Sequence, residues 1–208
     1  IISNLLYNHS RILMINKILK LNALVLFLSF FATAQPEQGK DYELIPSDLI
    51  EGQSVTEVFG YWCNACFSFE STVDLLKKQR PDVNVVQIPA GNEVYARLFY
   101  TIKALNLGKE AHLNVYKDIQ LLRKNLSSIS DVEAFAKRHN YNHTQFMNVY
   151  NSFGIGIKAT NALRKVRELG NAGVIEGVPT IIVNGKYKFR RTADVQKNID
   201  NMLFLYDN

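Results

Sequence analysis

The stretch Val55–Glu70, VTEVFGYWCNACFSFE, decides the fold of this 208-residue chain. Its first eight residues are dense in β-branched and aromatic side chains and predict a buried strand. Cys63 and Cys66, the chain's two cysteines, follow at once, and apolar residues then recur at helical spacing as far as Gln79. A second apolar run, Val83–Ile88, comes next. Strand, helix and strand in about 35 residues predict a βαβ unit with a right-handed crossover.

The C-terminal part of the chain predicts a β-hairpin. Thr180–Val183 and Tyr187–Arg190 flank Asn184-Gly185, and Asn-Gly between two strands is the strongest short hairpin signal. Asp41–Leu44 is a further short strand candidate. Between the βαβ unit and the hairpin, the apolar period is helical from Asn92 to Phe153. This order predicts a small α/β domain with a helical insertion.

Residue types typical of helix ends predict where the helices begin and end. Gly108 is expected to end the first of four helices in the insertion, and apolar residues from Val115 to Leu122 mark the second. Ser130-Asp131-Val132-Glu133 predicts a capping box for the third, and Asn142 a cap for the fourth. Two later helices are expected. One covers Lys158–Leu169, after Gly154 and Gly156. The other ends the chain and is expected to be capped by Thr192, with its inward face formed by Val195, Ile199, Met202, Leu203 and Tyr206.

The first 34 residues have the layout of a secretory signal peptide. Two lysines follow Met14, an apolar run covers Leu21–Phe31, and Ala32-Thr33-Ala34 closes it as a cleavage site. The run is much shorter than the roughly 20 residues of a membrane span. We expect residues 1–13 to lie upstream of the start and cleavage to leave a mature chain that begins at Gln35. The residue directly after the cleavage site is Gln35 and not a cysteine, so lipid attachment there is not expected.

Charge and composition exclude several classes of protein. With 47% hydrophobic and 21% charged residues, the sequence is typical of a folded domain and not of a disordered or collagen-like chain. The formal net charge of +5 includes three basic residues in the first 34 residues. Without them the chain has 21 basic and 19 acidic residues. A net charge of +2 gives no reason to expect nucleic-acid binding.

The two cysteines lie where the predicted strand ends and the helix begins. A helix N-terminus offers free N–H donors and a partial positive charge, which stabilise a thiolate. We therefore expect Cys63 to be exposed with a lowered pKa, and Cys66, one turn into the helix, to be more buried. Because the spacing of three residues lets the sulfurs meet, the pair is predicted to be a redox-active disulfide that opens and closes.

Two other roles for the cysteine pair stay open but fit less well. A structural disulfide that closes so small a ring removes little chain entropy from the unfolded state. A metal site needs two further ligands. The candidate histidines, His112, His139 and His143, all fall in the helical insertion. We expect no metal and no other cofactor.

A second signal is independent of the cysteines: Gly177-Val178-Pro179-Thr180 opens the first strand of the hairpin. A proline at the start of a core strand costs a ladder hydrogen bond unless the strand lies at an edge. As a cis proline, Pro179 would turn the chain and present the N–H and C=O of Val178 to an extended peptide. Val178 and Pro179 are therefore predicted to lie beside Cys63 and to bind substrate. An ordinary trans proline is the alternative.

Glu57 is the third element of the predicted site. It lies in the middle of an apolar strand, six residues before Cys63. Burial disfavours the charged carboxylate, so the pKa of Glu57 is expected to be raised. Glu57 could then carry the proton that Cys66 gains and loses, directly or through water. The alternative is a carboxylate that faces solvent at the strand end.

The chain resembles the DsbA family of periplasmic thiol:disulfide oxidoreductases in the Val55–Glu70 stretch, the Gly-Val-Pro-Thr segment and the closing hairpin and helix. The resemblance implies a thioredoxin-like fold with an inserted helical domain. Residues 35–91 and 154–208 would form the two parts of the thioredoxin-like domain, and residues 92–153 the insertion.

The resemblance also implies roles and partners. By position, Cys63 matches the family's nucleophile, Cys66 its partner, Glu57 its buried acid and Val178-Pro179 its cis-proline loop. Substrates would be reduced or unfolded exported proteins, and a membrane partner of the DsbB type would reoxidise the pair. We expect a monomer in the periplasm that binds no nucleic acid.

One departure from the family bears on the direction of the reaction. The family commonly has Pro-His between the cysteines, whereas this chain has Asn64-Ala65, and Ala65 offers no side-chain hydrogen bond. The Val83–Ile88 strand has no lysine to pair with Glu57. We therefore expect a less oxidising disulfide than in the strongest oxidases. The alternatives are a disulfide isomerase or reductase on the same fold, and a client- or metal-binding protein that is not an enzyme.

Overall fold

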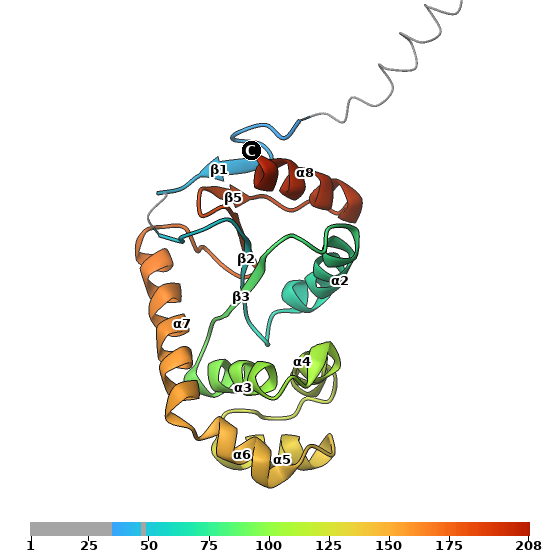
Figure 1. Ribbon diagram of the computed structural model, residues 1–208, viewed down its shortest axis with the longest axis vertical. Helices are drawn as coiled ribbons and strands as arrows, with labels where there is room; N and C mark the ends of the chain where they lie inside the picture. The colour runs from blue at the N-terminus through green and yellow to red at the C-terminus, as the bar shows by residue number, and fades with distance from the viewer. Residues whose placement is uncertain (1–34, 47–48) are drawn as a thin grey trace, which may run out of the picture. The chain divides into compact units, whose positions relative to one another are not determined.

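The computed structural model describes residues 35–46 and 49–208. These residues fold around one mixed sheet. The expected signal peptide, Met14–Ala34, lies outside the described residues. The strand order is β1-β5-β4-β2-β3 (Figure 1), with β2 and β3 parallel and the other neighbours antiparallel. The strands are β1 (Tyr42–Leu44), β2 (Val55–Phe59), β3 (Val85–Pro89), β4 (Thr180–Val183) and β5 (Tyr187–Phe189).

Helices connect and cover the strands. In the described part of the chain one helix lies between β2 and β3, a group of helices follows β3, and one helix ends the chain (Figure 1). They are α2 (Asn64–Gln79), α3 (Glu93–Ala104), α4 (Gly108–Tyr116), the π-helix η1 (Lys117–Leu121), α5 (Ile129–Arg138), α6 (His143–Tyr150), α7 (Phe153–Asn171) and α8 (Val195–Asp207).

The two faces of the sheet have separate cores. α2 and α8 pack on one face, where Val55, Ile181 and Val183 contact apolar residues of both helices. α7 packs on the other face, around Val58 and Ile182. Because successive side chains of a strand point to opposite faces, residue 57 of β2 lies on the same side as Val55, under α2.

The helical insertion shares its core with the cysteine loop. Helices α3 to α6 bury a large set of aromatic and aliphatic side chains, and Phe59, Tyr61 and Cys66 belong to the same cluster. The insertion therefore packs directly against the segment that carries the cysteines. The boundaries at residues 91/92 and 153/154 stay predictions.

The βαβ unit, the hairpin and the order of the elements are confirmed, as is the fold class. In the hairpin turn, Asn184 and Gly185 have φ of 52° and 63°, the left-handed region that this turn requires. The predicted strand from Val55 ends at Phe59, earlier than expected, because the chain turns there: the Cys63 N–H donates to the Gly60 carbonyl at 3.0 Å.

Two helix starts were predicted at the wrong residue. α5 begins after Ser128, not Ser130, because the Ser128 hydroxyl and the Asp131 carboxylate cap each other's backbone N–H groups. α8 is capped by Asp194, not Thr192, whose hydroxyl instead accepts from the Asp194 N–H at 3.2 Å. Val195 consequently faces outward, 38% exposed. The predicted cap at Asn142 is confirmed.

Two predictions that relied on glycine were also wrong. Asn106, with φ of 50°, takes the left-handed conformation after α3, and Gly108 begins α4 instead of ending α3. α7 begins at Phe153 and includes Gly154 and Gly156 in its first turns. The helix starts there because Ser152 caps it, with its hydroxyl accepting from the Ile155 N–H at 3.4 Å.

The second helix of the insertion ends in the π-helix η1, which the apolar period does not predict. The carboxylate of Asp118 in η1 is fully buried. It accepts from Arg138 Nε at 2.9 Å and lies 3.0 Å from His139 Nε2, which ties η1 to α5. Leu122, which follows η1, is 54% exposed and does not continue the buried face.

Replacing Asp118 by alanine should lower the free energy of unfolding by about 2 kcal/mol, because Arg138 and His139 would be left without their buried partner. Urea unfolding of the oxidised protein measures this. Glu110→Gln is the matched control, since Glu110 pairs with Lys117 on the surface and its loss should cost less than about 0.5 kcal/mol. Equal losses for the two variants would show that the Asp118 cluster does not hold η1 to α5.

Candidate active site

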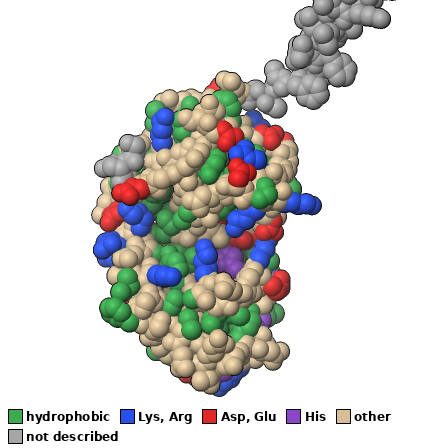
Figure 2. Space-filling view, viewed as in Figure 1, with side chains coloured by type: hydrophobic (Ala, Val, Ile, Leu, Met, Phe, Trp, Pro, Cys, Tyr) green, Lys and Arg blue, Asp and Glu red, His purple; other side chains and the backbone are tan. Residues whose placement is uncertain are grey.

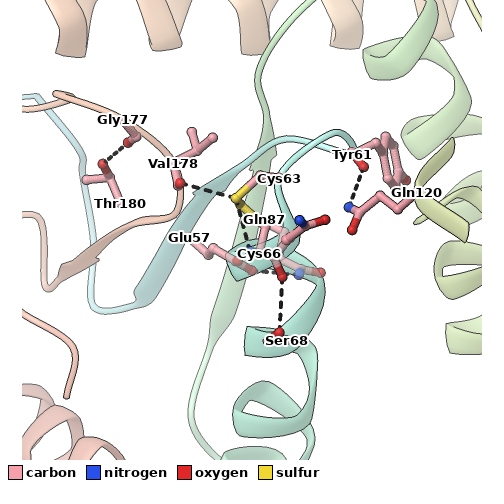
Figure 3. The surroundings of a disulfide bond; sticks show 11 residues. Glu57, Tyr61, Cys63, Cys66, Ser68, Gln87, Gln120, Gly177, Val178 and Thr180 are labelled. Atoms are coloured by element: carbon pink, nitrogen blue, oxygen red, sulfur yellow. Dashed lines mark hydrogen bonds between the residues drawn. A yellow bond between two sulfur atoms is a disulfide. The ribbon is translucent and has the colours of Figure 1, made fainter. Parts of the chain in front are cut away.

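The two cysteines form a disulfide at the start of α2 (Figure 3). Their Cα atoms are 5.2 Å apart. Cys63 is the N-cap residue, and its Sγ accepts a hydrogen bond from the Cys66 backbone N–H at 3.0 Å. Cys66 is completely buried, whereas Cys63 is partly exposed. The predicted difference in burial is confirmed, and one sulfur can be reached from solvent while the other is covered.

The loop before β4 lies beside the exposed sulfur, as predicted. The Val178-Pro179 peptide bond is cis, which rules out the alternative of a trans proline. β4 runs antiparallel to β2 with Thr180 opposite Val58, so the start of β4 meets the end of β2 that leads to the cysteines. The Val178 carbonyl oxygen lies 3.1 Å from Cys63 Sγ (Figure 3). Both Val178 and Pro179 are partly exposed.

Glu57 is a buried acid. Only 1% of its surface is exposed, so the alternative of a solvent-facing carboxylate is wrong. Gln87 stands directly opposite Glu57 in the β2–β3 register and donates from Nε2 to Glu57 Oε2 at 2.9 Å. Oε1 has no hydrogen-bond partner among residues 35–46 and 49–208. Burial, with a smaller contribution from the nearby Glu70 carboxylate, raises the pKa of Glu57 to about 8 against the opposing effects of Gln87 and Arg191.

A chain of hydrogen bonds leads away from Glu57. Gln87 Nε2 also donates to Glu70 Oε1, at 2.8 Å, and the same oxygen lies 3.0 Å from His112 Nε2. His112 Nδ1 is 2.8 Å from the hydroxyl of Tyr61. Burial alone would raise the pKa of Glu70, but the hydrogen bonds and charge of His112, together with Gln87, lower it below its ordinary value. The two buried carboxylates therefore differ, with Glu57 neutral and Glu70 charged near pH 7.

Sequence reasoning did not identify Glu70, Gln87 or His112 as parts of the site. Two of them could have been recognised in the sequence. Glu70 lies four residues after Cys66 on the apolar face of α2, and Gln87 is the polar residue of an apolar strand. A carboxylate and an amide at such positions need partners. His112 could not have been recognised, because it comes from α4 and meets Glu70 only in the folded chain.

The surface around Cys63 is apolar and held in place by close contacts. Trp62 is 46% exposed and stacks on Tyr95 with ring centroids 5.9 Å apart. Its indole lies against Gly60 and Gly91, where a Cβ would come within 3 Å of the ring. Gln120 of η1 donates to the Tyr61 carbonyl at 2.8 Å (Figure 3) and so ties the loop to the insertion.

Within residues 35–46 and 49–208 no three His, Cys, Asp or Glu side chains converge as a metal site would require. No helix in this part of the chain is both long and apolar enough to cross a membrane. What the site offers chemically is a disulfide with one accessible sulfur, a carbonyl beside it that can pair with an extended chain, and a neutral buried acid.

Relatives with this chemistry are found among curated proteins, although no protein-family model matches the chain. The chain is 33% identical over 166 residues to the thiol:disulfide interchange protein DsbA of Pseudomonas syringae pv. tomato, covering 75% of this chain and 76% of that protein. It is 30% identical over 182 residues to the DsbA of Pseudomonas aeruginosa, covering 81% and 84%.

Solved structures agree with these relatives. The crystal structure of Pseudomonas aeruginosa DsbA superposes with a TM-score of 0.71 at 27% identity, over 83% of this chain and 93% of that one. The oxidoreductase DsbA from Xylella fastidiosa has the same fold, with a TM-score of 0.64 at 22% identity, over 83% and 96%. The chain therefore belongs to the DsbA family and is a DsbA-type thiol:disulfide oxidoreductase with a thioredoxin-like fold.

Proposed function

We propose that this protein acts as a monomeric oxidase of reduced, exported proteins and that Cys63 is the sulfur their thiolates attack. The accessibility of Cys63 beside a completely buried Cys66 supports this most directly. Attack breaks the Cys63–Cys66 bond, joins the client to Cys63 and releases Cys66 as a thiolate. A second client thiolate then attacks the client sulfur of the mixed disulfide. The client is released with a new disulfide, and the enzyme keeps Cys63 and Cys66 in the reduced form.

Val178 and Pro179 are proposed to hold the client during this exchange. The Val178 carbonyl lies 3.1 Å from Cys63 Sγ, so a client strand that pairs with this backbone brings its own sulfur to Cys63. Main-chain hydrogen bonds do not depend on the client's side chains. This suits an enzyme that accepts many unfolded sequences.

Glu57 is proposed to supply the proton for the Cys66 thiolate. With a pKa of about 8, it is protonated at neutral pH, and Oε1 has no partner among the described residues. Transfer of its proton to Cys66 would prevent a buried thiolate from persisting next to apolar side chains. The reverse transfer would accompany re-formation of the disulfide.

The enzyme must be reoxidised after each turnover. We propose a membrane partner of the DsbB type for this step, and the periplasm as the compartment, on the basis of membership of the DsbA family and the signal-peptide pattern of residues 14–34. The partner would receive the two electrons of the reduced pair by disulfide exchange at Cys63, the accessible sulfur.

One observation favours isomerisation or reduction as a second function. The Cys66 N–H is the one hydrogen-bond donor to Cys63 Sγ among the described residues, and the Asn64 and Ala65 side chains donate nothing to it. A less stabilised thiolate makes the reduced form less favourable and the disulfide less oxidising.

The two single-cysteine variants separate the roles of the sulfurs. Cys66→Ser retains the accessible Cys63 and should form a mixed disulfide with oxidised glutathione. Cys63→Ser retains the buried Cys66 and should react at least about tenfold more slowly, because access limits exchange. Mass spectrometry of quenched samples measures both rates. Equal rates would contradict the assignment of Cys63 as the attacked sulfur, and neither variant should oxidise a reduced client catalytically.

The redox potential decides between oxidase and isomerase. Equilibration with glutathione should place the Cys63–Cys66 pair between about −180 mV, typical of protein disulfide isomerase, and about −120 mV, typical of DsbA. Ala65→His adds a donor next to the Cys63 thiolate and should raise the potential by about 30 mV. Asn64→Ala is the control and should leave the potential nearly unchanged. A potential of about −200 mV or lower would contradict the oxidase proposal.

Glu57→Gln tests the buried acid. In the folded protein Glu57 keeps its proton up to a pH of about 8, whereas the ordinary pKa of glutamate is 4.5. The folded state therefore binds more protons between these pH values, and Glu57 lowers stability increasingly as the pH rises through this window. The oxidised Glu57→Gln protein should gain stability over the parent by up to about 1.4 kcal/mol per pH unit across the window, and no further above it.

Unfolding in urea at a series of pH values measures this gain, with the exposed Glu51→Gln as control. The rate at which dithiothreitol reduces the disulfide provides a second measurement, because removal of the acid should slow reduction below pH 8 more than above it. A stability difference between Glu57→Gln and the parent that does not change with pH would contradict a raised pKa of Glu57.

A further inference from the structure

A cavity of about 340 Å³ opens at the edge of the sheet, away from the exposed sulfur. Its walls come from α2, β3, α3 and the start of α4. Figure 2 shows a hollow with a histidine side chain in it and Lys or Arg side chains around it. Its volume falls in the range of small-molecule sites. Exchange at Cys63 does not account for this cavity.

The inner wall of the cavity is largely apolar. Val73 of α2, Val85 of β3, and Phe99 and Ile102 of α3 line it. Val73, Phe99 and Ile102 are buried and belong to the two hydrophobic cores, so rigid elements form this wall. An apolar group of a ligand would gain by leaving water here.

The rim of the cavity carries positive charge that the protein does not neutralise. Lys77, Lys103 and Lys109 line the cavity, and Lys109 pairs with Asp74. In the described part of the chain neither Lys77 nor Lys103 has a carboxylate within ion-pair distance, and the Lys103 ammonium lies 5.1 Å from the centre of the Phe99 ring. Partial burial of its ammonium group, together with repulsion from Lys77 and Lys158, lowers the pKa of Lys103, although much of the side chain is exposed. An anion at the rim would relieve this repulsion.

The polar floor of the cavity determines how an anion can be oriented. Glu70 lies there as a charged carboxylate, and its Oε1 is already occupied by Gln87 and His112. The floor therefore repels a second negative charge and has few donors left to bind one. A ligand would have to place its negative group at Lys77 and Lys103 and its apolar part toward Phe99 and Ile102.

We propose that this cavity binds a small organic carboxylate with an apolar body about the size of one aromatic ring. The carboxylate pairs with the Lys77 and Lys103 ammonium groups, and the body fills the wall formed by Val73, Val85, Phe99 and Ile102. The proposal depends on the cavity and not on the direction of disulfide exchange, so it stands or falls separately from the oxidase function.

The probe for this site is 3-phenylpropanoate, added to the oxidised, isotope-labelled protein while amide chemical shifts are recorded. We expect saturable shifts confined to the cavity, including the amides of Phe99, Ile102 and Gly108. The neutral analogue 3-phenylpropanamide has the same body without the charge. It should bind at least about fivefold more weakly, which is the effect of losing ion pairs at a partly exposed site.

Lys77→Met/Lys103→Met should weaken binding of the carboxylate by about tenfold, because methionine keeps an unbranched apolar stem and removes the charge. Lys78→Met is the matched control, since Lys78 is the next residue of α2 and does not line the cavity. All three lysines are exposed, so the variants should fold as the parent does. Shifts that do not saturate, that spread over the surface, or that are equal for acid and amide would overturn the proposal.

Discussion

The pairing of β2 with a strand on each side is the constraint on which the site depends. β3 runs parallel to β2 and places Gln87 opposite Glu57, while β4 runs antiparallel and brings Pro179 to the end of β2. The chain leaves β2 at that same end and enters α2 through Cys63. A shift of one residue in either pairing would separate Gln87 from Glu57 or move the Val178 carbonyl away from the sulfur.

The two buried carboxylates show how surroundings set protonation. Glu70 accepts from His112 and Gln87 and stays charged, whereas Glu57 finds one donor, Gln87, in the described part of the chain and has a pKa raised to about 8. Glu57 is neutral and the neighbouring Glu70 is charged because Glu70 accepts more hydrogen bonds than Glu57 does. This difference in proton affinity leaves Glu57 protonated and Glu70 charged near neutral pH.

The helical insertion supports the loop that carries the cysteines. Its core includes Tyr61 and Cys66, and Gln120 and His112 reach from it to the carbonyl and the hydroxyl of Tyr61, two residues before Cys63. The active-site loop is therefore held between the sheet and the insertion. The π-helix η1 is part of this support, since it carries Gln120 and is fastened to α5 through Asp118.

The strands, the hairpin, the cysteine pair and the buried acid Glu57 were predicted from local patterns in the sequence. This was possible because residue spacing and turn chemistry act over a few neighbouring residues. Helix ends were less predictable, since Ser128 and Asp194 compete with neighbouring polar residues for the same backbone donors. The place of Val178 beside Cys63 was predicted from Pro179, whereas only the tertiary structure decided that Gln87 contacts Glu57 and that His112 contacts Glu70. Those two contacts join residues 30 and 42 positions apart, and sheet register and helix packing determine such distances, not any local pattern.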